Sequence, residues 1–354
     1  MNTQARAPRL YFNRRSALQV SIAALATSAA IPISGCGQNN SQASSQASSQ
    51  ASSQANSQKG LQIWEANALG APCFIKLADT NIEHARESFA HASSEIARLE
   101  NIFSLYKSDS EISRLNRDGE LQNMSNDMRD VLTISHTISV ATHGAFDISV
   151  QPLWQLAEQL PHMKITQDGI NHLWAQAFSR VDYKSIILEG TTVSFAKPDM
   201  AITLNAIAQG FITDKITQLL MKRGHKNGLV NIGEFRAFGH NNGHPWQVGI
   251  QDPRNVLDTL EIIALKNQSL ATSSALGGYI GDQIYHIFDA RNPDTSHSKP
   301  EFISASVIHN SAHIADALAT AFSLMDATSI RKCVSQFTNI QAILVRENGE
   351  VLKI

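Results

Sequence analysis

The stretch SAHIADALATAFSLM, residues 311–325, predicts the helix around which the fold is organised. It consists of small and apolar residues, with one acidic residue, Asp316, and one hydroxyl residue four positions later, Thr320. Residues four positions apart lie on one face of a helix, one turn from each other. A carboxylate and a hydroxyl so placed are suitable oxygen ligands for a hard cation such as Mg²⁺. The pattern also fits a half-buried helix in which Asp316 caps the first turn and Thr320 bonds its own backbone.

The composition indicates a globular protein with a large core. The chain has 354 residues, a formal net charge of −2 and 43% hydrophobic residues, which is enough for one large domain or two associated ones. Near-neutral charge with few basic clusters argues against nucleic acid as a partner. The three cysteines, Cys36, Cys73 and Cys333, provide no disulfide framework.

The N-terminus has the features of an export signal. Arg14 and Arg15 precede a mildly apolar run over residues 17–33, which ends in ISGC at residues 33–36. The run is shorter than the ~20 residues of a transmembrane helix. Its start resembles a bacterial twin-arginine signal, and its end resembles a lipobox, in which Cys36 becomes the lipidated first residue of the mature protein. A plain signal peptide with a chance cysteine remains the alternative.

A low-complexity segment follows Cys36. The motif Gln-Ala-Ser-Ser recurs over residues 38–58, and no apolar residue in it is larger than alanine, so it cannot bury enough surface to fold. We expect a flexible spacer. The predicted organisation is therefore an export signal with lipobox (1–36), a linker (37–60) and a folded domain (61–354). This organisation predicts a domain in the periplasm, held to a membrane of a bacterial cell envelope by a lipid anchor.

The folded part mixes helical and strand patterns. Helices are expected over residues 81–103, 128–142, 206–223, 311–325 and 328–336. Strands are expected over residues 61–77 with a break at Gly70, and over 185–188, 191–196, 228–232, 235–238, 246–250, 259–265, 269–272, 285–288, 303–309, 342–346 and 351–353. Because the two kinds of element do not alternate regularly, we predict an α+β fold of mixed or antiparallel strands with packed helices.

Several short segments could carry chemistry. Asn205 lies at a predicted helix start, where free amide groups can hold phosphate, but it serves equally well as a plain N-cap. His286 could act as a general base, although a lone strand histidine is more often structural. Glu234 and Arg236 beside a glycine predict a surface ion pair. No Gly-x-Ser-x-Gly or His-Glu-x-x-His motif is present, which excludes the commonest hydrolase classes.

In sequence order, these segments resemble the ApbE family, the FAD:protein FMN transferases, which are often exported bacterial lipoproteins. The resemblance covers nearly all of residues 61–354. The matching segments are FSLY (103–106), SEISRLN (110–116), GAFD (144–147), LNAIAQG (204–210), LVNIGE (229–234), WQVGI and DP (246–250 and 252–253), ATS (271–273), HIFD (286–289) and ADALAT (315–320).

The resemblance implies a site and a reaction. Mg²⁺ would be held by Asp316, Thr320 and the backbone carbonyl of Ala208. The residues implied to contact FAD are Leu69, Tyr106, Ala145, Phe146, Asp147, Asn205, Phe211 and Ile287. The FMN phosphoryl group of FAD would pass to a threonine or serine hydroxyl of an acceptor protein with an FMN-binding domain, and AMP would leave. His286 is the residue inferred to accept the hydroxyl proton.

The chain departs from the family pattern at four places. Leu69-Gly70-Ala71 stands for Met-Gly-Thr, Ser274 for the glycine of Thr-Ser-Gly, and Gln209 for a lysine. The Pro-x-Thr-Gly that usually follows His-x-x-Asp is ARNP here, at residues 290–293. Two alternatives therefore stay open: an FAD pyrophosphatase that uses water as the acceptor, and a flavin-binding lipoprotein without turnover.

Overall fold

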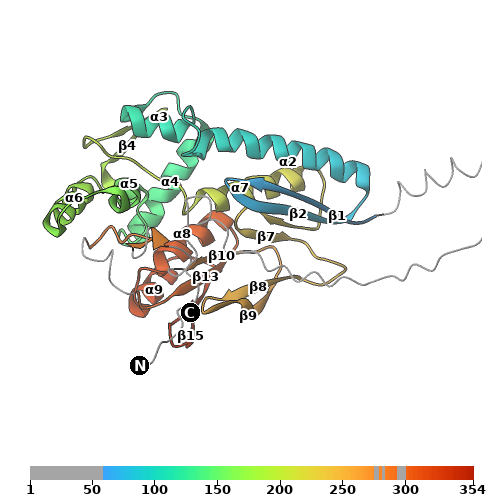
Figure 1. Cartoon of the computed structure of the whole chain (residues 1–354). Helices are drawn as coiled ribbons and strands as arrows, with labels where there is room; N and C mark the ends of the chain where they lie inside the picture. Colours follow the sequence, from blue (N-terminus) through green and yellow to red (C-terminus); the bar gives the residue numbers. More distant parts are fainter. Residues whose placement is uncertain (1–58, 275–278, 281–283, 293–299) are drawn as a thin grey trace, which may run out of the picture.

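An eight-stranded antiparallel sheet forms the centre of the protein (Figure 1). The computed structural model describes residues 59–274, 279–280, 284–292 and 300–354. The strand order is β1-β2-β6-β7-β10-β13-β14-β15, so strands from both ends of the folded part join one sheet. The bounds are Gly60–Ala68 (β1), Ala71–Thr80 (β2), Gly228–Asn231 (β6), Phe235–Phe238 (β7), Ser269–Ser274 (β10), Ser304–His309 (β13), Gln341–Val345 (β14) and Val351–Lys353 (β15).

Three helices cover one face of this sheet: α2 (Ile82–Phe103), α7 (Ala208–Lys222) and α8 (Ala312–Phe322). Apolar residues recur along α2 every three or four positions, and the buried ones include Phe89, Ile96 and Leu99. The three helices share one hydrophobic core with the inner strands. A further helix, α9 (Ala327–Val334), precedes the final hairpin.

The opposite face of the sheet is covered by a β-hairpin, β8 (Trp246–Asp252) with β9 (Asn255–Leu265). Trp246, Val248 and Leu265 form a second core with residues of the sheet such as Phe74 and Leu229. Both faces of the sheet are thus buried. Accordingly, β6 and β13 are buried along their whole length and do not alternate between buried and exposed residues.

A smaller helical part lies beside the sheet. It contains α3 (Glu111–Asp118), α4 (Asn126–Ala141), α5 (Gln151–Gln159), α6 (Gln167–Ser179) and the short 3-10 helices η1 (Ile148–Val150), η2 (Leu160–His162) and η3 (Tyr183–Ser185). A small sheet of order β3-β5-β4 completes it, with bounds Glu120–Leu121, Thr192–Phe195 and Ile186–Glu189. Two further short strands, β11 (Tyr279–Ile280) and β12 (Ile284–Tyr285), pair with each other.

The α+β class with antiparallel strands and packed helices is confirmed, but three local predictions are wrong. Residues 61–77 are a hairpin and not one broken strand, because Leu69 and Gly70 both adopt positive φ, 51° and 81°, as a two-residue turn requires. Helices α5 and α6 were not predicted. The strand expected over residues 285–288 ends at Tyr285.

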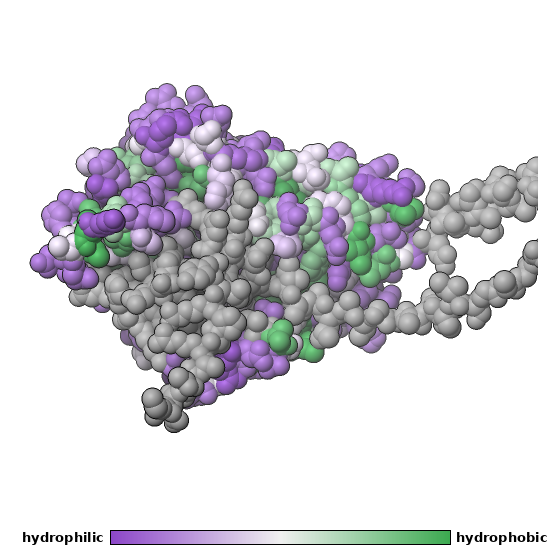
Figure 2. Space-filling model, in the orientation of Figure 1, coloured by the Kyte–Doolittle hydropathy of each residue, from purple (hydrophilic) through white to green (hydrophobic). Residues whose placement is uncertain are grey.

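The distribution of hydrophilic and hydrophobic residues on the surface is that of a globular domain. On the face shown in Figure 2, hydrophilic residues predominate over α3 and α6, and hydrophobic residues lie in separate areas. Within the described residues, no helix combines the length and the hydropathy needed to cross a membrane. Cys36 and the rest of the predicted signal and linker up to residue 58 lie outside the described residues.

Candidate functional site

The first turns of α7 and α8 meet, and each receives a carboxylate from the other helix. The Gly210 N–H donates to Asp316 Oδ2 at 3.1 Å, and the His313 N–H donates to Asp214 Oδ2 at 3.2 Å. Both carboxylates therefore lie at a positively polarised helix N-terminus. The expectation that Asp316 caps its own helix is wrong, because α8 begins at Ala312 and the N-cap, Ser311, makes no side-chain cap bond.

Gly210 permits the close approach of the two helices. A Cβ atom at this position would lie 2.5 Å from the carbonyl oxygen of Ala312 and 2.7 Å from the Cα of His313. Because both neighbours are backbone atoms, no side-chain rotation could relieve such a contact. Small, fully buried residues of α8, including Ala315 and Ala319, keep the helix close to its neighbours.

Asp316 lies beside a second carboxyl group, that of Glu234. Burial raises the pKa of Asp316 to about 7, although the hydrogen bond from Gly210 opposes the shift. Burial and the charge of Asp316 together raise the pKa of Glu234 well above its ordinary value. Among the residues that the structure describes, no lysine or arginine pairs with either group. Two carboxyl groups that lack a protein cation are typical of a site for a divalent ion.

The predicted surface ion pair between Glu234 and Arg236 is wrong. Arg236 pairs instead with Asp214, with a distance of 3.1 Å between Arg236 Nη1 and Asp214 Oδ1. Residues two apart on a strand point to the same face. Glu234 directly precedes β7, so the spacing could have indicated that its side chain and that of Arg236 lie on the same side of the sheet.

Thr320 lies one turn beyond Asp316, as predicted, near the end of β10. Its Oγ1 is 3.0 Å from Ser273 Oγ, a contact that the sequence analysis missed. Ala208 is the first residue of α7, two positions before Gly210. The described residues contain no group of three or more His, Cys, Asp or Glu side chains able to hold a metal. The oxygen donors present suit Mg²⁺, which keeps several ligands from water or phosphate.

Leu69 and Tyr106, two residues expected to contact FAD, lie on neighbouring segments joined by Glu100. Glu100 Oε1 accepts a hydrogen bond of 2.8 Å from the Leu69 N–H, and its Oε2 lies 3.3 Å from Lys107 Nζ. Tyr106 is 56% exposed, whereas Leu69 packs against the main core. An aromatic ring exposed beside an apolar turn offers a surface for a planar ligand.

The segment Ala145-Phe146-Asp147 is held mainly by its own neighbours. The side chains of Ala145 and Phe146 are buried in the core. Asp147 accepts hydrogen bonds from the N–H and Oγ of Ser149, at 2.7 and 2.6 Å, and from the Tyr183 N–H at 3.1 Å. Burial raises the pKa of Asp147 despite these bonds. These bonds fix the orientation of the Asp147 side chain.

Asn205 is exposed and does not cap α7. The helix begins at Ala208, later than predicted, because residues 204–207 form a separate turn in which the Ala208 N–H donates to the Leu204 carbonyl. The N-cap, Ile207, provides no side-chain hydrogen bond, so the side-chain acceptor in the first turn of α7 is Asp316, which bonds the Gly210 N–H.

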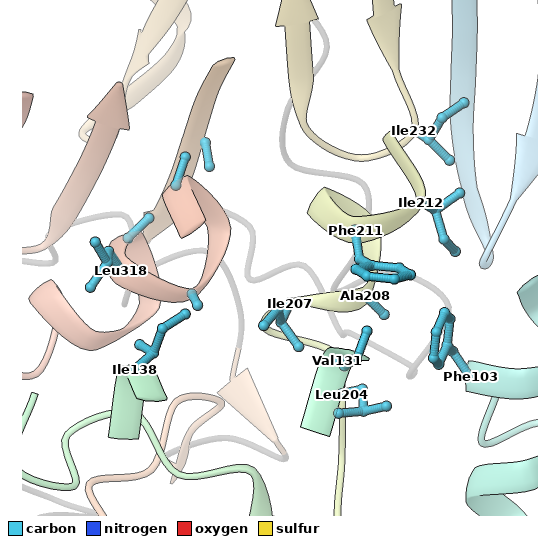
Figure 3. Close-up of a cluster of buried hydrophobic side chains, with 14 of the residues drawn as sticks. Phe103, Val131, Ile138, Leu204, Ile207, Ala208, Phe211, Ile212, Ile232 and Leu318 are labelled. Atoms are coloured by element: carbon cyan, nitrogen blue, oxygen red, sulfur yellow. The ribbon is translucent and has the colours of Figure 1, made fainter. Parts of the chain in front are cut away.

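Phe211 is buried in the core, and its ring packs edge-on against Phe103 with 5.6 Å between the ring centroids. Figure 3 shows both rings beside Ala208 at the start of α7. Phe103 is the last residue of α2, just before the loop of Tyr106, and Phe211 lies in the first turns of α7, near Asp316. The aromatic pair therefore packs the Tyr106 loop against the helix start that carries Ala208.

His286 and Ile287 form a half-buried bend after β12. The next residues are firmly held. Phe288 packs against Trp154, and both oxygens of Asp289 contact Arg291. Arg291 in turn donates to the carbonyl of Leu324, which follows α8. The structure thus connects the predicted catalytic segment to the helix that carries Asp316 and Thr320.

Comparisons with known proteins identify the family and the fold. The model of the ApbE family matches residues 69–344. A curated relative, "FAD:protein FMN transferase" of Haemophilus influenzae, is 28% identical over 71% of this chain and 76% of the relative. The protein of the same name from Escherichia coli (strain K12) is 26% identical over 72% of this chain and 75% of the relative.

Solved structures share the fold. The ApbE protein of Thermotoga maritima superposes with a TM-score of 0.72 at 24% identity, covering 83% of this chain and 96% of that protein. The flavin transferase ApbE from Vibrio cholerae gives a TM-score of 0.69 at 22% identity, covering 84% of this chain and 97% of that protein.

Proposed function

The chain belongs to the ApbE family, and on this basis we propose that it transfers FMN from FAD to a hydroxyl group of an acceptor protein. The curated relatives that carry the name FAD:protein FMN transferase support this assignment. The observation that carries it in this chain is the pairing of Asp316 and Thr320, one turn apart on α8, with the first turn of α7, where the Gly210 N–H donates to Asp316. The protein is therefore a transferase and FAD is its substrate.

The proposed metal is Mg²⁺, held by Asp316, Thr320 and the backbone carbonyl of Ala208. When bound, Mg²⁺ would neutralise the charge of the phosphate oxygens of FAD. The raised pKa values of Asp316 and Glu234 support this assignment, because a nearby cation would favour the charged form of both carboxyl groups.

The chain's own residues then position the pyrophosphate. The positively polarised first turn of α7 would attract an anion, and Thr320 and Ser273 add hydroxyl groups near the end of β10. Phosphoryl transfer depends mainly on positioning the phosphate and on neutralising its charge. The groups named here are of the types that perform these two tasks.

We assign the proton transfer to His286. The acceptor oxygen forms a bond to the phosphorus of the FMN part, the pyrophosphate bond breaks, and AMP leaves with the bonding electron pair. His286 takes the proton of the hydroxyl group. Asp289 is a poorer candidate, because Arg291 occupies both of its oxygens.

The proposed acceptor is a protein with an FMN-binding domain, modified at a threonine or serine. The test is to incubate the purified protein with FAD, Mg²⁺ and such a domain, and to measure the intact mass of the acceptor. Attachment of one FMN, together with release of AMP, supports the proposal. Release of FMN and AMP without any attachment would show instead that water is the acceptor.

We further propose that the protein acts in the periplasm, lipid-anchored at Cys36. The export signal and lipobox over residues 1–36 and the low-complexity linker over residues 37–60 support this proposal. The linker would separate the folded domain from the membrane and let it reach acceptor proteins.

A further inference from the structure

Asp289 and Arg291 form a two-pronged salt bridge directly after the His286 segment. Arg291 Nε lies 2.7 Å from Asp289 Oδ1, and Arg291 Nη2 lies 2.6 Å from Asp289 Oδ2. The Arg291 N–H also donates to Asp289 Oδ1 at 3.0 Å. The side chain of Asp289 is only 10% exposed. A planar guanidinium on a carboxylate fixes orientation as well as distance, so this turn has a defined geometry.

The same guanidinium reaches helix α8. Arg291 Nη2 donates to the carbonyl of Leu324 at 2.6 Å, just beyond the last residue of α8, Phe322. A helix C-terminus presents free carbonyl groups and a partial negative charge, which favours a cation there. The Arg291 stem also passes close to Gly144, where a Cβ atom would lie 3.7 Å from Arg291 Cγ. Arg291 therefore joins three segments around the site.

Phe288 supplies a second anchor beside the first. Its side chain is 5% exposed, and its ring lies 6.0 Å from the ring of Trp154 and 5.9 Å from that of Trp174. The two residues that follow Ile287 are thus held from two sides, by the aromatic cluster and by Arg291. His286 and Ile287 are directly continuous with this double anchor.

We propose that Arg291 is a positioning residue that fixes the main chain of His286 and Ile287 relative to α8. This contact would hold His286, the proposed proton acceptor, at a fixed position relative to Asp316 and Thr320 on α8. The inference rests on the proposed transfer of FMN. Positional errors of about 1 Å at a reacting group can cost about 10²-fold in rate, so a residue outside the chemistry can have a large effect.

The chain contains a matched control for this contact. Asp252 and Arg254 have the same spacing and the same two-pronged geometry, with 2.9 Å between Nε and Oδ1 and 2.5 Å between Nη2 and Oδ2. This pair lies in the turn between β8 and β9, on the opposite face of the sheet from α7 and α8. Replacing Arg254 removes a similar two-bond salt bridge at a place remote from the proposed active site.

The experiment measures FMN transfer by Arg291→Met, Arg291→Lys and Arg254→Met, with kcat, KM for FAD and melting temperature from one preparation of each. We expect Arg291→Met to lower kcat by about 10- to 100-fold while KM for FAD changes little. Arg291→Lys should recover part of the rate, because lysine keeps the positive charge but cannot form two parallel hydrogen bonds with the Asp289 carboxylate. Arg254→Met should keep the wild-type kcat.

A double variant tests whether Arg291 acts through His286. If it does, adding Arg291→Met to His286→Asn should cause little further loss of rate. An equal fold-loss in both backgrounds, a wild-type kcat in Arg291→Met, or an equal loss in Arg254→Met would each overturn the positioning role. Wild-type protein that transfers no FMN would instead overturn the proposed function, and the inference with it.

Discussion

At the scale of single residues, Asp316 combines two opposed properties. The proposed metal site requires its charged form, yet burial raises its pKa to about 7, so this charge is costly without a cation. A raised pKa in the folded state means that this group favours folding at low pH. That contribution is lost as the pH rises through about 7. The metal-free protein should therefore become less stable as the pH rises from about 4, near the ordinary aspartate pKa, to about 7.

We predict that Asp316→Asn abolishes Mg²⁺-dependent FMN transfer and melts at a higher temperature than wild type in EDTA at pH 8. The amide keeps the shape of the side chain and can still accept the Gly210 hydrogen bond, but it removes the buried charge. Added Mg²⁺ should raise the melting temperature of the wild type only. Transfer that survives the substitution, or survives EDTA in the wild type, contradicts the metal assignment.

His286 is predicted to act in the chemistry and not in binding. His286→Asn should bind FAD nearly as well as wild type and transfer FMN about 10²–10⁴-fold more slowly, the usual cost of losing a general base. His91→Asn, at an exposed position of α2, is the control and should transfer normally. FAD affinity, melting temperature and transfer rate are measured together. Equal loss of binding and stability would indicate a structural role for His286.

At the scale of elements, the contact between α7 and α8 depends on Gly210. Gly210→Ala places a Cβ atom against the Ala312 carbonyl, and such overpacking costs about 1–3 kcal/mol. The shift should also separate Gly210 from Asp316 and lower the transfer rate.

Gly169→Ala is the matched control, since Gly169 is the third residue of α6 as Gly210 is of α7. Its Cβ atom would meet Thr166 at an ordinary 3.5 Å, so we expect a gain of up to about 1 kcal/mol from helix propensity. The melting temperatures of the two variants, compared with that of the wild type, test whether the Gly210 position tolerates a Cβ atom. Equal effects of the two substitutions would show that the close approach of α7 and α8 is unimportant.

The carboxylate of Asp214 holds α8 from the other side. Burial alone would raise its pKa, but the hydrogen bond from His313 and the charge of Arg236 outweigh burial and lower it. The interaction therefore stabilises the fold above the ordinary aspartate pKa of about 3.9 and is lost as the pH falls through the lower, folded-state value.

We predict that Asp214→Asn costs about 3 kcal/mol at pH 7, because it leaves Arg236 without its partner. The difference from wild type should begin to shrink as the pH falls below the ordinary aspartate pKa of about 3.9, and it should vanish below the lower folded-state pKa, where folded wild-type Asp214 is neutral as well. Urea unfolding at several pH values measures both effects, and Asp168→Asn at an exposed site should stay close to wild type. A difference that does not depend on pH would argue against an ionic role.

At the scale of the whole molecule, the proposed lipid anchor would determine where the enzyme works. Cys36→Ser should release the protein from the membrane fraction, because no acyl chain can then be attached. The released protein should still transfer FMN in solution, since every residue of the proposed site lies within the domain of residues 61–354. Cell fractionation with an immunoblot tests the first outcome. A Cys36→Ser variant that stays in the membrane fraction would show that another segment holds it.

The sequence alone determined the features that depend on local periodicity. Apolar spacing predicted α2 and α8 within a few residues, and the spacing of Asp316 and Thr320 placed them one turn apart. It also predicted the α+β class, since helical and strand patterns are both local. It missed α5 and α6, and it misread Leu69-Gly70 as a break in one strand although the two residues form the turn of a hairpin.

Only the tertiary structure decided which residues meet across the chain. The bond between Gly210 and Asp316 spans 106 residues, and that between Asp214 and His313 spans 99. Periodicity indicates which side of an element is buried but not which partner covers it. Glu234 beside Asp316 and Arg291 at the end of α8 were therefore invisible in the sequence, because the packing of α7 and α8 on the sheet creates both contacts.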